Sequence, residues 1–138
     1  MKRNMLLLLY AALMIALLAP KILHAEEIVN EVYLLEREDK LLAFSGLRNS
    51  WSEKDLRTGE TVLKSMYDGN VAVAYTTERA LGFSGITGRW AEKRFRIRES
   101  VTSISAKGDI ATVITDIRAL AFNAKTGNWV ETQFKLNQ

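Results

Sequence analysis

The chain has 138 residues, with 19 Lys and Arg side chains against 16 Asp and Glu, and it contains no cysteine. This length predicts one or at most two small domains, and the lack of cysteine excludes disulfides and thiolate metal sites. The only histidine, His24, and the only proline, Pro20, lie within the first 25 residues. Catalysis by serine-histidine or cysteine-histidine pairs and histidine metal sites are therefore excluded beyond that segment.

Residues 1–25 have the layout of a secretory signal peptide. Lys2 and Arg3 precede an apolar run over residues 5–19, and a short segment then leads to Ala25, after which we expect cleavage. The apolar run is shorter than the roughly 20 residues that a membrane-spanning helix needs. Removing residues 1–25 leaves 16 basic and 16 acidic side chains, so the formal net charge of the mature chain is zero. We expect a periplasmic or secreted protein with no membrane span after cleavage and no electrostatic reason to bind nucleic acid.

Residues 26–138 are predicted to form a single domain built on a repeat of 39 residues. Trp51, Trp90 and Trp129, the only tryptophans of the chain, are spaced by this period. Leucine, phenylalanine, glutamate and basic positions repeat with it, as in Leu42, Leu81 and Leu120; Phe44, Phe83 and Phe122; Glu53, Glu92 and Glu131; and Lys40, Arg79 and Arg118. So many matches exclude coincidence, and they divide the domain into units of about 30–68, 69–107 and 108–138.

Turn residues repeat with the same period and separate short β-prone segments. Gly and Asn, which tolerate a positive φ, recur at positions 30, 69 and 108 and at positions 49, 88 and 127. In the middle unit they leave strands predicted over residues 71–76, 79–84, 90–95 and 101–106. We predict a tight turn over residues 76–79 rather than one long strand. A further turn is predicted at Thr58-Gly59, whereas its counterpart, Ile97-Arg98, lacks turn residues.

Each unit has an apolar strand after a Gly or Asn turn, and in the middle unit a Leu-x-Phe-Ser-x-x-Thr-Gly-x-Trp segment follows over residues 81–90. In this arrangement the units resemble the blades of β-propellers, over residues 30–138. The resemblance is architectural and implies an all-β half propeller of three antiparallel blade-like repeats, but no particular function. Three blades are fewer than a closed ring needs, so two chains are expected to close a six-bladed ring as a homodimer.

One feature bears on how such units close. The last unit has no counterpart of its fourth strand, which leaves an expected open edge at residues 129–136. Other three-fold β folds, a trefoil or a prism, and a meander β-barrel are the alternative architectures for a chain of short strands.

Each unit also contains a Trp-x-Glu pair of a kind that can hold a sugar ring. The aromatic face stacks on the ring, and the carboxylate accepts hydrogen bonds from its hydroxyl groups. Three copies would raise avidity through multivalency. The repetition favours a structural role, with each Trp packed between sheets and each Glu paired with Lys40, Arg79 or Arg118 of an adjacent strand. The candidate ligand-binding residues of this motif are Trp51, Trp90, Trp129, Glu53, Glu92 and Glu131.

Arg94, Arg96 and Arg98 are the conspicuous departure from the repeat. On a strand all three side chains point to the same side, where they can bind an anionic polymer or a phosphate group. The commoner role of such a row is a solvated strand face, neutralised here by neighbours such as Glu99 and Asp55.

These observations together predict an exported, non-catalytic binding or interaction module whose ligand is a glycan or a protein of the cell envelope. We expect no catalytic residue, metal or cofactor, because residues that repeat three times are better explained by the fold than by one asymmetric pocket. One alternative is a structural subunit of an envelope assembly that joins other chains through an open sheet edge. Another is a small carboxylate-dependent hydrolase, for which Glu53, Glu92 and Glu131 are the candidates.

Overall fold

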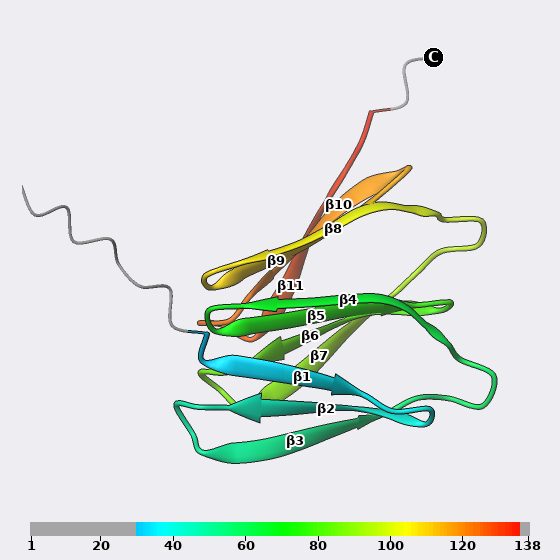
Figure 1. Cartoon of the computed structure of the whole chain (residues 1–138). Coiled ribbons are helices and arrows are strands. Elements are labelled where there is room, and N and C mark those ends of the chain that lie inside the picture. The colour runs from blue at the N-terminus through cyan, green and yellow to red at the C-terminus, as the bar shows by residue number, and fades with distance from the viewer. Residues whose placement is uncertain (1–29, 136–138) are drawn as a thin grey trace, which may run out of the picture.

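The computed structural model describes residues 30–135, which form eleven β-strands and no helix (Figure 1). The strands lie in three open antiparallel sheets, so the predicted all-β class is confirmed. The first sheet contains β1 (Val32–Glu36), β2 (Lys40–Ser45) and β3 (Ser50–Asp55). The middle sheet contains β4 (Val62–Asp68), β5 (Val71–Thr76), β6 (Arg79–Ser84) and β7 (Arg89–Arg94). The third sheet contains β8 (Val101–Lys107), β9 (Ile110–Thr115), β10 (Arg118–Asn123) and β11 (Asn128–Gln133). The predicted signal peptide lies outside the described residues.

The three sheets are stacked face to face, with the middle sheet between the first and the third (Figure 1). They are packed more closely along β4 and β8 than along β7 and β11, so the middle and third sheets diverge toward their last strands. No sheet closes on itself within residues 30–135. The alternative of a meander barrel is therefore wrong.

Apolar side chains fill both spaces between the sheets. The middle sheet contributes to both, because its central strands β5 and β6 are almost entirely buried. The cluster between the first and middle sheets consists of Val32, Leu34, Leu41, Ala43, Ala72, Ala74, Leu81 and Phe83. The cluster between the middle and third sheets consists of Val71, Val73, Ala80, Ile104, Ala111, Val113, Leu120, Phe122 and Ala124. Burying each large side chain of this kind stabilises the fold by about 1.5–3 kcal/mol.

A serine hydroxyl group forms an equivalent hydrogen bond from one sheet to the next at each of the two interfaces. Ser45 of the first sheet donates a hydrogen bond to the carbonyl oxygen of Gly85 at 2.5 Å. Ser84 of the middle sheet, one repeat later, donates to the carbonyl oxygen of Ala124 at 2.5 Å. The two sheet-to-sheet interfaces are therefore built from the same contacts, one repeat apart.

Tight turns link the strands where the repeat has Gly and Asn. Positive φ angles are found at Asn49, Gly69, Gly88, Gly108 and Gly127. The chain also turns between β5 and β6, where the hydroxyl of Thr76 accepts hydrogen bonds from the N–H groups of Glu78 and Arg79 at 3.0 and 3.1 Å. The predicted break over residues 76–79 is therefore confirmed.

The chain also turns at Ile97-Arg98, although the sequence there lacks turn residues. Arg98 has a φ of 65° and takes the place of Gly59, whose φ is 78°. The carboxylate of Glu99 holds this loop by accepting a hydrogen bond from the N–H of Arg96 at 2.6 Å. A left-handed conformation costs a non-glycine residue about 1 kcal/mol, which this hydrogen bond offsets.

The grouping of the strands also differs from the predicted units. Those units join residues 101–106 to the strands before them, but β8 pairs with β9 in the next sheet. The turn at Gly108-Asp109 makes that hairpin, as Gly69-Asn70 does for β4 and β5, whereas residues 95–100 carry the chain across to another sheet. The last sheet is therefore complete, and the expectation that it lacks a strand is wrong. Among the described residues, the first sheet is the one with three strands.

Candidate functional site

Two of the three tryptophans connect neighbouring sheets. The indole N–H of Trp90 donates a hydrogen bond to the carbonyl oxygen of Ser52 at 3.4 Å, and that of Trp129 donates to Ala91 at 3.1 Å. Each ring is half-buried and reaches the last strand of the preceding sheet. Trp51 has no preceding sheet among residues 30–135, and 54% of its surface is exposed. The three tryptophans are therefore not three equivalent binding sites.

The glutamates of the Trp-x-Glu pairs are bound by basic side chains. The pairs within each sheet are Lys40 with Glu53 at 3.0 Å, Arg79 with Glu92, and Arg118 with Glu131 at 2.6 Å. The preceding sheet adds a second cation, Lys54 at 3.1 Å from Glu92 and Lys93 at 2.9 Å from Glu131. Burial alone would raise the pKa of Glu92, but Lys54 and Arg79 hold it below its ordinary value. Glu92 and Glu131 thus act in sheet-to-sheet ion pairs.

A buried ion pair lies at the crossover from the first to the middle sheet. The carboxylate of Glu60 accepts two hydrogen bonds from the guanidinium of Arg79, at 2.8 and 2.9 Å, and one from the hydroxyl of Thr76 at 2.6 Å. The backbone N–H of Arg57 donates a fourth at 2.8 Å. Burial alone would raise the pKa of Glu60, but these hydrogen bonds lower it to about 2. Glu60 therefore stays ionised at neutral pH, where a general acid must carry a proton.

The same network recurs one repeat later. Glu99 accepts two hydrogen bonds from Arg118, at 2.7 and 2.9 Å, and one from the hydroxyl of Thr115 at 2.9 Å. Sequence reasoning did not find these contacts, although the 39-residue spacing of Glu60 and Glu99 was a visible signal. Their repetition identifies them as parts of the fold.

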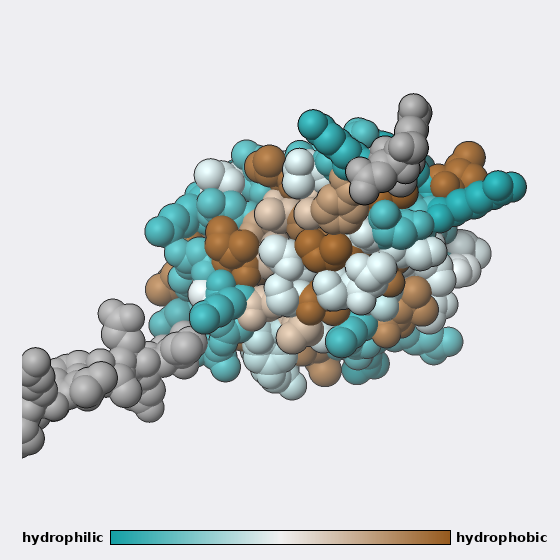
Figure 2. Space-filling model, turned by 90° about the horizontal axis from the view of Figure 1, so that it is seen from above, coloured by the Kyte–Doolittle hydropathy of each residue, from teal (hydrophilic) through white to brown (hydrophobic). Residues whose placement is uncertain are grey.

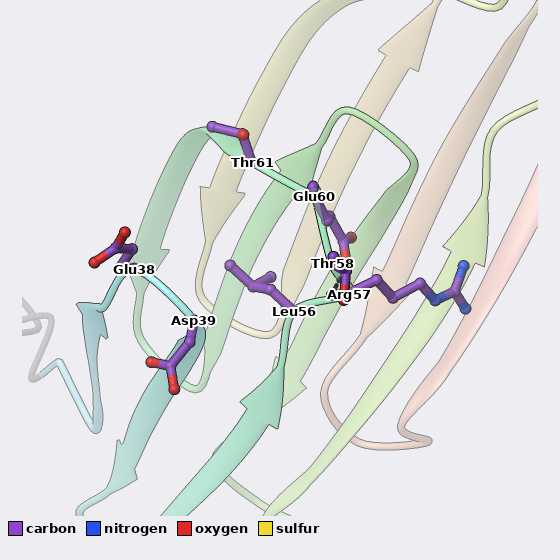
Figure 3. A pocket seen from close by; sticks show the side chains of 8 residues that line it. Glu38, Asp39, Leu56, Arg57, Thr58, Glu60 and Thr61 are labelled. Carbon is purple, nitrogen blue, oxygen red and sulfur yellow. Dashed lines mark hydrogen bonds between the residues drawn. The ribbon is translucent and has the colours of Figure 1, made fainter.

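A shallow hollow of about 420 Å³ lies beside Glu60 (Figure 3). Leu56 points into it, Glu38 and Asp39 line it from the turn between β1 and β2, and the side chain of Arg57 points away (Figure 3). A second hollow, of about 360 Å³, lies at the next crossover and is lined largely by the equivalent residues one repeat on. Both hollows are consequences of how the chain crosses between sheets.

The predicted arginine row is not formed. β7 ends at Arg94, so Arg96 and Arg98 lie in the crossover, and the three side chains do not share one strand face. The guanidinium of Arg96 lies 3.5 Å from the carboxylate of Glu131 in the third sheet. The expected neutralising neighbour, Glu99, belongs instead to the buried network described above.

The outer face of the first sheet exposes large apolar side chains. We call it the aromatic face, and it consists of Tyr33, Leu35, Leu42, Phe44 and Trp51. Tyr33 is 49% exposed and Trp51 is 54% exposed. Their rings meet edge to face at 6.5 Å, and Phe44 is tilted against Trp51 at 5.3 Å. Tyr67 of β4 adds a further edge contact to Tyr33 at 5.6 Å. The rings hold one another in place, so the face is preformed.

The equivalent faces of the other two sheets are covered. Leu81 and Phe83 in the middle sheet are fully buried, whereas their first-sheet equivalents, Leu42 and Phe44, are only half-buried. The third sheet agrees with the middle one, because Phe122 is also fully buried. The aromatic face is therefore a sheet-packing surface to which no sheet is packed within residues 30–135.

Comparison of the chain with protein-family models, with curated proteins and with solved structures finds no match. Among residues 30–135, no helix is long and apolar enough to cross a membrane. In the same described part of the chain, no three Asp or Glu side chains are grouped so that they could hold a metal ion. Within residues 30–135, the aromatic face is a surface whose chemistry the fold itself does not use.

Proposed function

We propose that the chain is an exported, non-catalytic interaction module that binds a protein partner through the aromatic face. The signal-like composition of residues 1–25 supports export to the periplasm or beyond. The observation that carries the proposal is the unequal burial of equivalent residues, since Phe83 and Phe122 are covered by a sheet and Phe44 is not. An exposed surface with the composition of a buried interface is characteristic of a protein-binding site.

The chemistry of the aromatic face favours a protein over a glycan. Tyr33 stands edge-on to Trp51 and Phe44 is tilted against it, so two aromatic rings pack against the indole ring. Glu53, the carboxylate of this Trp-x-Glu pair, is occupied by Lys40 at 3.0 Å. A sugar needs hydrogen-bonding groups around the aromatic ring, whereas the apolar face of another sheet needs close contact and no such groups.

The carboxylates give the hydrolase alternative little support. Burial alone would raise the pKa of Glu60, Glu92 and Glu99, but hydrogen bonds and charges of their Arg and Lys neighbours hold it below the ordinary value. A glycosidase needs one carboxyl group with a raised pKa to protonate the leaving group.

We also propose that the three sheets are blades of a propeller-like ring. The closer packing along β4 and β8 than along β7 and β11 supports this arrangement, because blades are wedges that diverge from a central axis. The order of the strands supports it too, since consecutive strands run from one edge of each sheet to the other.

A photo-crosslinking amino acid placed at Tyr33 tests the proposed function in the source organism. We expect a protein adduct of defined mass from this position and none from the control position Ile97, which is 95% exposed in a crossover loop. Adducts only with glycan, or no adduct at position 33, would contradict the proposal. A probe at Phe134, just beyond β11, examines the edge-joining subunit, because adducts there with none at position 33 would favour that alternative.

A further inference from the structure

We infer that the occupant of the aromatic face is the outer face of the third sheet of a second copy of this chain. This inference rests on the proposed function and names its partner. The two outer faces of the stack correspond to the two sides of the sheet-to-sheet interface that occurs twice within it. Between the first and middle sheets, and again between the middle and third, one sheet packs through the side opposite its own Phe and Trp residues on the side of the next sheet that carries Phe and Trp.

The outer face of the third sheet, which we call the third-sheet face, is the second half of this interface. It consists of Ile110, Thr112, Ile114, Ala119, Ala121, Asn123 and Val130. Val130 is 69% exposed, whereas its equivalent in the middle sheet, Ala91, is half-buried beneath the third sheet. Viewed from the side of this sheet, apolar and weakly polar residues occupy the centre and hydrophilic ones gather toward the margins (Figure 2). This pattern matches an interface core with a polar rim.

The repeat predicts the hydrogen bonds between the two copies. Trp90 and Trp129 donate to the carbonyl oxygens of residues 52 and 91, so the next carbonyl in the series is that of Val130. Trp51 of one copy is therefore expected to donate to Val130 of the other. Likewise, Ser45 and Ser84 donate to residues 85 and 124. The amide of Asn123, one repeat after Ser84, is then expected to donate to the carbonyl oxygen of Gly46.

An ion pair is predicted in the same way. Arg57 of the first sheet's crossover lies 3.6 Å from Glu92, and Arg96, one repeat later, lies 3.5 Å from Glu131. The next basic residue in the series is Lys135, and the matching carboxylate is Glu53, which lies on the same side of the first sheet as the aromatic face. The two ends of the stack therefore carry the cation and the carboxylate that this series requires.

The sizes of the facing side chains compensate across the series. At the first interface, Leu34 and Leu41 face a surface that contains Ala72 and Ala74. On the third-sheet face, the positions equivalent to Leu34 and Leu41 hold the smaller residues Thr112 and Ala119. On the aromatic face, the positions equivalent to Ala72 and Ala74 hold the larger residues Tyr33 and Leu35. Large residues on one side are thus matched by small ones on the other, which keeps the total volume suitable for close packing.

Such an interface joins two different surfaces, so each copy uses one of its two faces for each neighbour. Two copies that close on each other would make a ring of six sheets with two identical interfaces.

The first experiment is the mass of the chain by light scattering over a range of concentrations, with its N-terminus determined by mass spectrometry. We expect a dimer or a larger ring, and a monomer at all concentrations would overturn the inference.

Two charge substitutions identify the surfaces. Trp51→Asp blocks the aromatic face and Val130→Asp blocks the third-sheet face. Both positions are more than half exposed in the single chain, so we expect the fold to be retained. Each variant alone is expected to be monomeric, with association weakened at least about 100-fold. The control Ile97→Asp, in an exposed crossover loop, is expected to associate like the parent. Circular dichroism and thermal unfolding of the diluted proteins check that all three variants are folded.

Mixing the two variants tests the head-to-tail arrangement. The mixture retains one intact interface, the third-sheet face of the Trp51→Asp copy against the aromatic face of the Val130→Asp copy. A one-to-one complex weaker than the parent dimer is therefore expected. If Val130→Asp alone associates like the parent, two aromatic faces pair with each other and the inference is wrong.

The crosslinking experiment above separates this inference from the proposed function. A monomeric chain whose position 33 crosslinks to a different protein would overturn self-association and leave the interaction function standing. A monomeric chain without any protein adduct at position 33 would overturn both.

Discussion

The indole N–H of Trp129 donates a hydrogen bond to the carbonyl oxygen of Ala91, 38 residues earlier, at 3.1 Å. Trp90 makes the same contact to Ser52, and Trp51, with no preceding sheet among the described residues, is more than half exposed. One residue type at one repeat position therefore has two structural roles. The role depends on whether another sheet is packed in front of it.

Alanine substitutions at the three tryptophans are expected to give unequal losses of stability. Trp90→Ala and Trp129→Ala each remove a hydrogen bond and leave a cavity between sheets, so we expect a loss of about 3–4 kcal/mol in the free energy of unfolding. Trp51→Ala is expected to cost about 1 kcal/mol, because its ring is already more than half exposed. Urea unfolding at a concentration where the chain is monomeric measures these differences. Three equal losses would contradict this assignment.

The periodicity allowed much of the fold to be predicted, because Gly and Asn at fixed positions mark turns by a backbone requirement that neighbouring sheets do not change. β5 and β6 begin and end where the sequence predicts. The assignment of hairpins to sheets could not be predicted, since the crossover at residues 95–100 and the hairpin turn at Gly108 both appear as short breaks between strands. Arg98 shows why, because its turn is held by the carboxylate of the next residue, Glu99, and that carboxylate is in turn bound by Arg118 of the third sheet, which lies far away in the sequence.

The candidate site could be predicted only in part. The pairing of Glu53, Glu92 and Glu131 with basic residues of adjacent strands follows from the repeat, and the structure has it. The different exposure of Trp51 could not be predicted, because its own sequence surroundings match those of Trp90. Exposure is set by the presence of another sheet, which is a property of the assembled stack.

The buried carboxylate of Glu60 predicts a loss of stability in acid. Its pKa lies at about 2 in the folded chain against an ordinary value of 4.5, so its stabilising contribution is complete above pH 4.5 and is lost as the pH falls toward 2. The shift corresponds to about 3 kcal/mol, of which about 2 kcal/mol disappears between pH 5 and pH 3. Denaturant unfolding at these two pH values is expected to show at least this loss.

Glu60→Gln is the variant that isolates this contribution. Its free energy of unfolding at pH 7 is expected to fall by about 3 kcal/mol, because Arg79 stays buried but loses the negative charge of Glu60. Its further loss between pH 5 and pH 3 is expected to be smaller than that of the parent, since Gln does not titrate. The matched control Glu38→Gln, at an exposed turn position, is expected to change neither value by more than about 0.5 kcal/mol. An unchanged pH dependence in Glu60→Gln would contradict the assignment.

The planar guanidinium of Arg79 is the part of this network that lysine cannot replace. It donates to both oxygens of Glu60 and to the carbonyl oxygen of Asp55, and it also binds Glu92. Arg79→Lys is therefore expected to cost about 2–4 kcal/mol, although the charge is retained. At the equivalent position of the first sheet, Lys40→Ala removes a single exposed pair and is expected to cost less than about 1 kcal/mol. Thermal unfolding of the two variants side by side measures the contrast.

The close approach of the middle and third sheets can be tested at Gly69. This residue has a φ of 52°, and a Cβ atom there would lie 2.6 Å from the carbonyl oxygen of Gly108 and 2.7 Å from its Cα. Gly69→Ala therefore combines backbone strain with a clash against rigid backbone, and we expect a loss of about 2–4 kcal/mol. Gly59→Ala isolates the strain, because that residue also has a positive φ, 78°, but no atom within 4 Å of the added Cβ. Its expected cost is about 1 kcal/mol, so equal losses in the two variants would mean that the sheets are further apart at this turn than the structure shows.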